Sequence, residues 1–569
     1  ALFDLATLQD SPSVNRNIND IIQQDPRIYI DQGRDDIDSV QCNGANPRYN
    51  SLTVDGIRLN DGFGLNSNGY PTQRMPFPYD AISSVAVELA PMSVIYGGFS
   101  ACNINAVTKS GSNEWEANAF YEYTSNSWAE DTLDGNAVRS DESYTEDKYG
   151  FSVGGPILKD RLFFFAAYEE TEEPRFLAST FAGGSGGVEK PWLSQEDYNR
   201  IQQIARDVYG YDPGGQGGNG AQTTENYLVR VDWNISDNHD LALIYNYYDG
   251  AQNRNSDGFP IGDPNEFEFS NHRYTKGSES ETYTAIFRSQ WTDSFSTELF
   301  YTDTRMDDSQ VTDGPKDIGD HQIQVGGLFR NTVYLGADDS RQANNLFTDT
   351  QFLKLSFEKL AGNHVFSGGY EQEDLEVFNI FVQQSNGGEW DYRDYSGNNP
   401  AICDTFDAQG RYEDWLLGEA GNGCFMSGID AFELGRPYSV DYSSAPGTNN
   451  PLDAAASFTN TLHALYLQDE IYFPNSDFTL TAGLRFEWFS SDDTPNFNEN
   501  LSNALGFRND KGIDGLSLLM PRIGFTWGVR DDLTLRGGVG LFSGGNPNVW
   551  LANAWSNDGI ASRFTRGTY

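Results

Sequence analysis

Histidines and glycine-rich segments are the first places to look for catalysis in this chain, and neither has the required spacing. The histidines are His239, His272, His321, His364 and His463. No two of them form an H-x-x-x-H or H-E-x-x-H pattern, which a zinc hydrolase uses to place two ligands on one helix face. The glycine-rich segments at residues 183–189 and 214–220 lack the GK[ST] ending of a phosphate-binding loop. We therefore expect no enzyme, no catalytic residue and no cofactor.

Carboxylates gather in two polar segments. One segment carries Asp257, Asp263, Glu266 and Glu268, and the other carries Asp391, Asp394, Asp404 and Asp407. Ca²⁺ takes several oxygen ligands, so either cluster could hold a structural Ca²⁺. The spacing is not that of an EF-hand loop, and a solvated acidic loop without a metal is the alternative.

The chain has four cysteines, Cys42, Cys102, Cys403 and Cys424, and none forms a C-x-x-C pair. Cys403 and Cys424 bracket a polar stretch rich in Gly and Asp, which fits a disulfide that closes an exposed loop in an oxidising compartment. Cys42 and Cys102 could form a second disulfide, and two buried free thiols are the alternative for that pair.

Aromatic residues are frequent around the second cysteine pair. They are Trp390, Tyr392, Tyr395, Trp415 and Phe425. Tyr and Trp suit contact surfaces because each brings a large rigid area and a polar group. These side chains could therefore bind a ligand, or they could pack the loop into a stable cap.

The elements that position these residues are expected to be strands, because aromatic residues make up 14% of the chain. No run of about 18 apolar residues exists, so no membrane-spanning helix is expected. A mean hydropathy of −0.56 does not exclude a membrane protein, since a spanning strand needs an apolar residue only at every second position. The net charge of −46 would repel a polyanion, so nucleic acid is not expected as a partner.

Alternation of apolar and polar residues marks the strands. In Phe478–Trp488, six apolar residues alternate with Thr, Gly, Arg and Glu, so one face suits lipid and the other a wet interior. Residues 227–234, 353–358 and 522–527 alternate in the same way. About 13 such strands are joined alternately by short turns and long loops, which is typical of an outer-membrane barrel. A soluble β-sandwich is the alternative, but its strands are shorter and its loops are not sorted by length.

The N-terminal part is expected to have shorter strands than the rest of the chain. Three short apolar runs, Ile82–Leu89, Val94–Tyr96 and Ile104–Val107, are separated by Gly, Ser, Asn and Pro and predict three brief strands. Ile18, Ile21 and Ile22 predict one face of a short helix. The region is therefore expected to be a compact mixed unit.

This unit resembles the plug of TonB-dependent outer-membrane receptors, whose pattern is a VDG turn, an I-x-x-V-E-V strand, a YG turn and a G-x-I-N-x-x-TKSG end. The matching residues are Val54, Asp55, Gly56, Ile82, Val85, Val87, Glu88, Tyr96, Gly97, Ile104, Asn105, Thr108, Lys109, Ser110 and Gly111. Residues 150–170, 466–488 and 541–559 resemble barrel segments of the Oar-like subgroup. The resemblance implies an all-β transmembrane fold, a large antiparallel outer-membrane β-barrel with a mixed α/β N-terminal plug inside it.

The resemblance also implies a plug at residues 1–113 and a barrel at residues 114–569. Barrels of this family have about 22 strands, so we expect the chain to be incomplete at its C-terminus. The TonB box of the family should lie just upstream of residue 1, unless this protein lacks it. A signal peptide is expected there as well.

The family places a basic residue after the I-x-x-V-E-V strand, where it contacts barrel carboxylates. Ala90 and Pro91 stand there in this chain, so the contact is expected from Arg58 or Arg74 instead. The plug-motif residues carried over from the resemblance are Asp55, Gly56, Glu88, Tyr96, Gly97, Asn105, Thr108 and Lys109.

The function that the resemblance implies is import across the outer membrane of a Gram-negative bacterium. The ligand would be a peptide, protein or glycan-type nutrient, and the partners would be the TonB–ExbB–ExbD complex, outer-membrane lipid and lipopolysaccharide. A non-transporting surface protein for adhesion or docking is the main alternative. A passive porin would lack the plug motif, and a soluble secreted binding protein would need no detergent.

Overall fold

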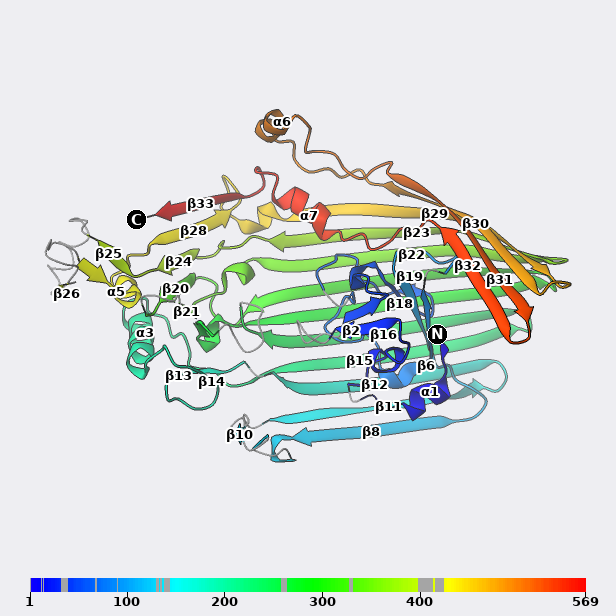
Figure 1. The fold of residues 1–569 in the computed structure, drawn as a ribbon, viewed down its shortest axis with the longest axis horizontal. Helices are drawn as coiled ribbons and strands as arrows, with labels where there is room; N and C mark the ends of the chain where they lie inside the picture. Colours follow the sequence, from blue (N-terminus) through cyan, green and yellow to red (C-terminus); the bar gives the residue numbers. More distant parts are fainter. Residues whose placement is uncertain are drawn as a thin grey trace.

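The computed structural model describes residues 2–11, 13, 15–31, 39–66, 69–89, 91–128, 132–133, 136–137, 144–175, 177–256, 264–326, 331–397, 413–414 and 424–568. A long curved sheet forms a wall, and a small N-terminal unit lies against its concave side (Figure 1). No helix in this described part is long and apolar enough to cross a membrane.

The wall is a 13-stranded antiparallel sheet in which each strand pairs with its neighbour along the chain. Its strands are β8 (Glu116–Ser125), β11 (Thr145–Leu158), β12 (Leu162–Arg175), β15 (Gly220–Ser236), β16 (His239–Arg254), β18 (Tyr274–Thr292), β19 (Phe295–Thr312), β22 (Asn344–Ala361), β23 (His364–Phe381), β29 (Ala456–Phe473), β30 (Phe478–Ser490), β31 (Ser517–Arg530) and β32 (Leu533–Gly540). The predicted strands and short turns are confirmed. The short turns share one end of the wall, on the right in Figure 1, and the long connections share the other.

The two faces of the wall have opposite character. Apolar side chains on the outer face are exposed, with Leu484 at 52% and Ile523 at 50%. The alternate residues on the inner face are buried although they are charged, and Arg485 and Arg522 are both 0% exposed. A soluble protein shows the reverse distribution, with apolar side chains buried and charged ones exposed. The arrangement seen here is expected for strands that meet lipid outside and a blocked interior inside.

The plug is built on a five-stranded sheet in the order β1 (Leu2–Phe3), β6 (Ile82–Leu89), β7 (Cys102–Thr108), β4 (Ser51–Val54), β5 (Ile57–Arg58). The sheet is mixed, because β4 and β7 are parallel while the other pairs are antiparallel. Two short helices, α1 (Leu5–Asp10) and α2 (Asn19–Ile22), and the hairpin of β2 (Ile28–Asp31) and β3 (Ser39–Cys42) complete the unit. The predicted helical face is confirmed, since Ile18, Ile21 and Ile22 are all 0% exposed. The domain boundary predicted at residue 113 falls between β7 and β8.

The strand predicted at Val94–Tyr96 is wrong, because this segment is a turn. Its backbone groups bond to wall side chains instead of to a neighbouring strand. The amide of Val94 donates to Gln468 Oε1 at 2.9 Å, and the carbonyl of Tyr96 accepts from Arg522 Nη1 at 2.8 Å.

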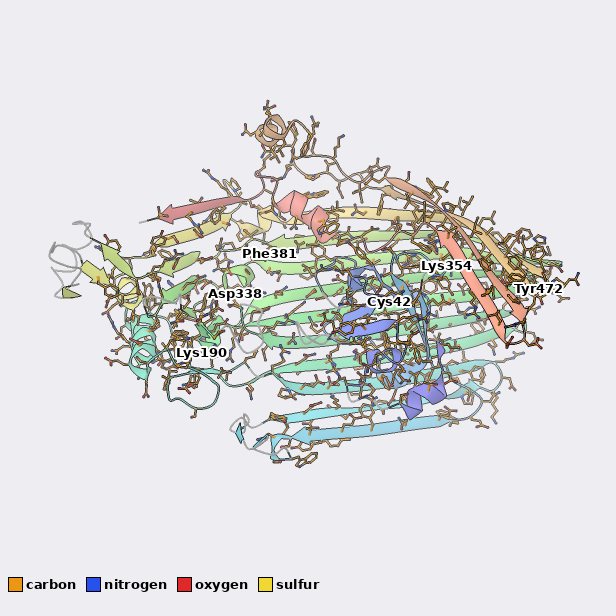
Figure 2. The ribbon with its side chains drawn as sticks, in the orientation of Figure 1. Cys42, Lys190, Asp338, Lys354, Phe381 and Tyr472 are labelled. Atoms are coloured by element: carbon orange, nitrogen blue, oxygen red, sulfur yellow. A yellow bond between two sulfur atoms is a disulfide. The ribbon has the colours of Figure 1, made fainter. Side chains whose placement is uncertain are left out.

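The disulfide predicted between Cys42 and Cys102 is confirmed. It joins the β2–β3 hairpin to the central strand β7, and Figure 2 shows Cys42 inside the plug. The bond lies in the plug core, and both cysteines are buried.

The long connections fold into a second compact region at their own end of the wall, here called the cap. Its six-stranded sheet has the order β17 (Glu266–Glu268), β21 (Thr332–Leu335), β20 (Asp320–Gln324), β24 (Glu389–Tyr392), β28 (Ser439–Ser444), β33 (Arg563–Thr568). The helices α3 (Gln195–Asp207) and α5 (Gly428–Glu433) pack on it around a separate apolar core. Regions expected to be plain loops therefore contain ordered structure, because four connections share one core.

Smaller elements complete the described fold. They are β9 (Thr132–Leu133), β10 (Asn136–Ala137), β13 (Ser179–Phe181), β14 (Val188–Lys190), β25 (Tyr395–Gly397), β26 (Glu413–Asp414), β27 (Cys424–Met426), α6 (Glu499–Leu505) and α7 (Val549–Ser556). In Figure 2, Lys190 and Asp338 mark the cap end and Tyr472 marks the short-turn end of the molecule.

Candidate functional site

The contact between the plug and the wall is the first part of the candidate site, and buried ion pairs hold it. Arg58 of the plug bonds to Glu371 Oε2 at 3.0 Å and to Glu373 Oε2 at 3.1 Å on β23. Arg485 of β30 shares the same Glu371 oxygen at 2.6 Å and also bonds to Glu487 at 2.7 Å. The sequence predicts that Arg58 or Arg74 contacts barrel carboxylates in place of Ala90. The structure shows such a contact for Arg58 here and for Arg74 at Glu173.

A second set of ion pairs anchors the plug to β12. Arg74 pairs with Glu173, which also accepts from Lys148 Nζ at 3.0 Å. Arg16 bonds to Glu169 at 3.1 Å and lies over the ring of Phe120, with 3.5 Å between the guanidinium carbon and the ring centroid. The plug is therefore fixed on two sides of the wall, at β12 and at β23 with β30.

The plug-motif residues Asp55 and Thr108 meet at the wall. Asp55 Oδ1 accepts from the Thr108 amide at 3.0 Å and Oδ2 accepts from the Thr108 hydroxyl at 2.5 Å. Arg230 of β15 donates to the same hydroxyl at 3.1 Å and lies 3.5 Å from Asp55 Oδ2. Gly56, at a φ of +88°, forms the adjacent turn against Phe300 of the wall. The motif therefore ties the β4–β5 turn to β7 and to the barrel.

Tyr96 and Gly97 follow the turn at Val94 and Ile95, where two wall arginines bond to the plug backbone. Arg522 Nη1 donates to the carbonyl of Tyr96, and Arg485 Nη1 donates to the carbonyl of Val94 at 3.3 Å. The guanidinium of Arg485 lies directly against Gly97, where an added Cβ would stand 2.4 Å from Nη2. Only glycine leaves room for the arginine at this position.

The Gly97→Ala variant is expected to lose about 1–3 kcal/mol of stability at the plug contact, which is the usual cost of overpacking a filled site. Arg485 cannot yield easily, because it is fully buried and bonded to two carboxylates. The matched control is Gly62→Ala in the same domain, since nothing lies within 4 Å of a Cβ there. Amide hydrogen exchange of the plug strands should rise in the first variant only, and equal rates in both would contradict the assignment.

The remaining motif residues lie inside the plug. Asn105 accepts from the Thr53 hydroxyl at 2.7 Å across the parallel pair. Burial raises the pKa of the half-buried Glu88 carboxyl, one of whose oxygens has no hydrogen-bond partner in the described part. Burial lowers the pKa of the Lys109 ammonium, and the Lys109 amide donates to the Ala81 carbonyl at 2.7 Å. Asn105 and the Lys109 backbone therefore support the plug's own structure.

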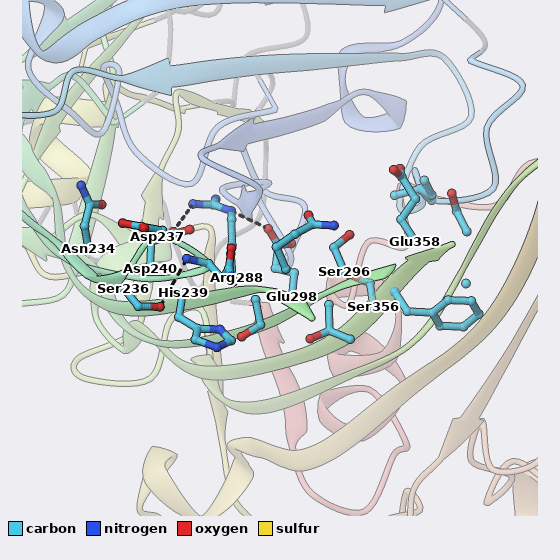
Figure 3. Close-up of a pocket in the computed structure, with 18 of the residues that line it drawn as sticks. Asn234, Ser236, Asp237, His239, Asp240, Arg288, Ser296, Glu298, Ser356 and Glu358 are labelled. Carbon is cyan, nitrogen blue, oxygen red and sulfur yellow. Dashed lines mark hydrogen bonds and ion pairs between the residues drawn. The ribbon is translucent and has the colours of Figure 1, made fainter. Parts of the chain in front are cut away.

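Below the plug, toward the short turns, the wall and the plug border a polar cavity of about 740 Å³ that is partly open to solvent (Figure 3). Its charged residues include Asp240, Arg288, Glu298 and Glu358, and the plug contributes Ile95. Arg288 bonds to Glu298 Oε2 at 3.0 Å and lies 3.5 Å from Asp240 Oδ2. The cavity is therefore a hydrophilic space that a polar molecule could cross.

A second cavity of about 1040 Å³ follows the underside of the plug. It is lined by Arg16, Asp55, Thr108 and Lys109 of the plug and by wall residues that include Arg230. Both cavities are lined by Arg288, so they meet at this side chain. The space on the short-turn side of the plug is thus already hollow, while the plug contacts above it are tight.

The aromatic residues predicted to bind a ligand lie in the cap. Tyr392 is 1% exposed in the cap core, while Trp390 and Tyr395 are partly buried against it. Trp415 and Cys403 lie outside the described residues, and the ligand role of Trp390 and Tyr395 stays a prediction. Tyr392 packs the core of the cap, which is the role considered as the alternative to ligand binding.

The carboxylates proposed for Ca²⁺ fall partly outside the described residues, namely Asp257 and Asp263 of the first cluster and Asp404 and Asp407 of the second. Glu268 is buried and accepts from the Ser256 amide at 3.1 Å, and Glu266 accepts from the Tyr334 hydroxyl at 3.2 Å. Within the described ranges, no three His, Cys, Asp or Glu side chains are arranged to hold a metal ion. Calcium binding by the acidic loops stays a prediction.

Sequence reasoning missed the buried His321 at the centre of the cap. Its ring lies 5.0 Å from that of Tyr209, 5.8 Å from Tyr392 and 5.6 Å from Phe432, measured between ring centroids. Burial lowers the pKa of His321 to about 3, with a smaller contribution from His272. No local pattern distinguishes this histidine, because these three aromatic residues and His272 come from three other connections.

Acid is expected to destabilise the cap through His321. The folded pKa lies below the unfolded value of about 6.5, so the unfolded chain binds the proton first as pH falls. Stability from this group is complete above pH 6.5 and declines by about 1.4 kcal/mol per pH unit down to pH 3. Asp320, whose pKa burial raises, acts in the opposite direction.

The His321→Phe variant isolates the histidine, since it keeps an aromatic ring and removes the titration. Limited proteolysis of the cap at pH 7.5 and pH 4.5 measures the effect. Acid should increase cleavage more in the unmodified protein than in the variant. The same acid response in both would show that His321 does not control it.

The wall arginines Arg230, Arg485 and Arg522 were also missed as site residues. Each stands at a polar position in an alternating strand, which is the one signal that the sequence offers. Their plug partners lie more than a hundred residues away, so spacing could not have paired them.

Two family models match the chain. The outer membrane beta barrel domain matches residues 107–182 and 212–565, and the TonB-dependent receptor plug domain matches residues 3–102. The TonB-dependent transporter Oar of Myxococcus xanthus is 31% identical over 222 residues, which are 36% of this chain and 19% of that protein. The chain thus spans only a fraction of this relative.

Solved structures show the same fold. The outer membrane transporter YddB from Escherichia coli superposes with a TM-score of 0.60 at 12% identity, over 99% of this chain and 63% of that one. The siderophore receptor PirA from Acinetobacter baumannii superposes with a TM-score of 0.53 at 14% identity, over 95% of this chain and 60% of that one. The plug held inside an antiparallel wall agrees with both family models. The chain therefore belongs to the TonB-dependent receptors, plugged β-barrels of the Gram-negative outer membrane, and is similar to Oar.

Proposed function

We propose that the full-length protein captures an extracellular ligand and imports it into the periplasm with energy from the TonB–ExbB–ExbD complex. The observation that carries this proposal is the plug. Buried ion pairs at Glu371 and Glu169 hold it across the lumen, while polar cavities lie beneath it. A plug that seals one side of a hydrophilic space needs an energy source to open, and the family couples that step to TonB.

The ligand class is a separate part of the proposal. Peptides, proteins and glycans are the candidates, and PirA, which shares the fold, is a siderophore receptor. The cap supports capture at the long-loop end, because it presents a folded surface with its own core rather than loose loops.

Contact with outer-leaflet lipid is also proposed. Tyr168, Tyr227 and Tyr247 form a row across neighbouring strands, with ring centroids 5.4 and 5.1 Å apart. Interface aromatics of this kind suit the level of the lipid headgroups, where lipopolysaccharide is the expected partner.

Uptake by whole cells tests the transport proposal. Cells that produce the full-length protein would be given fluorescent oligosaccharides, oligopeptides and a ferric siderophore, and periplasmic extracts would be measured. We expect one probe to accumulate only when the host has TonB and a proton-motive force. Accumulation without TonB would indicate a passive pore, and binding without accumulation would support the adhesion or docking alternative.

A further inference from the structure

Residues 541–556 run along the wall and cover the plug on its cap side, where Figure 1 places α7 beside β29. The Val549 amide donates to the Phe63 carbonyl at 2.8 Å, and the Asn548 side chain donates to the Gly62 carbonyl at 2.8 Å. Pro547 packs directly against Gly64, leaving no room for a Cβ there. This segment is thus part of the surface that a ligand meets when it reaches the plug from the cap side.

Further contacts of the same segment reach two other plug loops. The ring of Phe542 lies 5.5 Å from that of Phe99, and Gly545, at a φ of +69°, is in close contact with Tyr49. The segment therefore touches the plug near residues 49, 62–64 and 99. A force applied to it would reach all three plug loops.

Helix α7 has one packed face and one open face. Ala552 packs with the plug residue Phe63 and with Val377 and Phe458 of the wall, and Trp555 packs beside them. On the other side Trp550 is 67% exposed, and Asn553, one helical turn further on, is exposed as well. An exposed tryptophan beside an exposed amide is a typical ligand contact, because the ring offers area and the amide offers a donor and an acceptor.

The chemistry of this face is uncharged. No Asp, Glu, Lys or Arg occurs between Leu541 and Asn557, although the chain carries 83 acidic and 37 basic residues. Asn546 and Asn557 are also exposed and add two further amides. An ionic ligand finds no counter-charge in this segment, whereas hydroxyl groups can both donate to and accept from the amides.

We infer that the open face of α7 is a ligand contact for an uncharged, hydroxyl-rich molecule, that is, a neutral oligosaccharide. The Trp550 ring would stack on the C–H face of a sugar, and Asn553 would bond to its hydroxyls. This inference rests on the proposed function and names its substrate class. Because the same segment bonds to Gly62 and Phe63, a ligand on α7 is joined to the plug through two hydrogen bonds.

Binding of a panel of neutral oligosaccharides to the detergent-solubilised full-length protein tests the inference. We expect at least one member to bind, and Trp550→Ala to weaken it at least tenfold. Trp550→Phe, which keeps an aromatic face, should restore most of the affinity. The matched control is Trp115→Ala. Trp115 is equally exposed, at 67%, but it lies far from α7 in the sequence and makes an edge-to-face contact with Phe164 at the start of the barrel.

The outcomes separate this inference from the transport proposal. If no oligosaccharide binds, or if Trp550→Ala and Trp115→Ala bind equally well, the inference is overturned, even if cells import a peptide. If binding depends on Trp550 but cells do not accumulate the sugar, the α7 contact stands and the transport proposal fails. Tighter binding of charged peptides that depends on Trp550 would also overturn the assigned ligand class.

Discussion

The Glu371→Gln variant is expected to lose about 3 kcal/mol of the free energy that holds the plug in the barrel. Glu371 is 4% exposed and accepts from two arginines, Arg58 at 3.0 Å and Arg485 at 2.6 Å. Removing one partner from a buried ion pair costs about 3–5 kcal/mol, because the remaining charge stays desolvated. Glu373 and Glu487 each keep one arginine paired, which favours the lower end of that range.

Amide hydrogen exchange of the purified protein measures this loss. Because 1.36 kcal/mol corresponds to a factor of ten, a loss of about 3 kcal/mol should accelerate exchange of the plug strands by about 160-fold. Glu376→Gln is the matched control, since Glu376 lies on the same strand but is exposed on the other face. If the two variants exchange at the same rate, the buried ion pairs do not hold the plug.

Removal of the plug disulfide is expected to have an effect of similar size. In the Cys42→Ser, Cys102→Ser double variant, the unfolded plug regains the freedom of a loop with a sequence separation of 60. The chain-entropy relation gives about 4 kcal/mol for a loop of this length, within the usual range of about 2–5 kcal/mol. The bond joins the β2–β3 hairpin to β7, so we expect the hairpin to open first.

Urea titration with exchange detection on the two plug segments measures this prediction. The double variant should lose protection at a lower urea concentration than the oxidised unmodified protein. After reduction, the unmodified protein should lose protection at the same urea concentration as the double variant. Both cysteines are buried, at 2% and 0% exposure, so reduction should be slow until urea is added. Equal midpoints for the oxidised protein and the double variant would show that the disulfide does not stabilise the plug.

Much of the barrel could be predicted from the sequence, because strand faces and turns are local properties. Leu484 and Phe486 alternate with Arg485, and the structure exposes the first two and buries the third. The plug was recognised through a dense motif, and within it Asp55 and Thr108 meet through hydrogen bonds. A strand was wrongly predicted at Val94–Tyr96, because the wall arginines bond to carbonyls that the sequence assigns to a sheet.

The cap could not be predicted, because its core draws on connections that are far apart in the chain. Tyr198, Phe267, Ile323 and Phe432 lie in four different connections and share one core. Each connection alone is polar and rich in Gly and Asn, which is typical of a loop. Only their joint packing produces the sheet and the buried His321.

The order of apolar and polar residues already determines where this chain has barrel strands and which face of each strand meets lipid. Those properties depend on residues one or two positions apart. The site depends on distant partners instead, since Glu371 lies 313 residues from Arg58 and 114 from Arg485. Such groups meet only when the wall curves around the plug, and burial then makes their pairing strong.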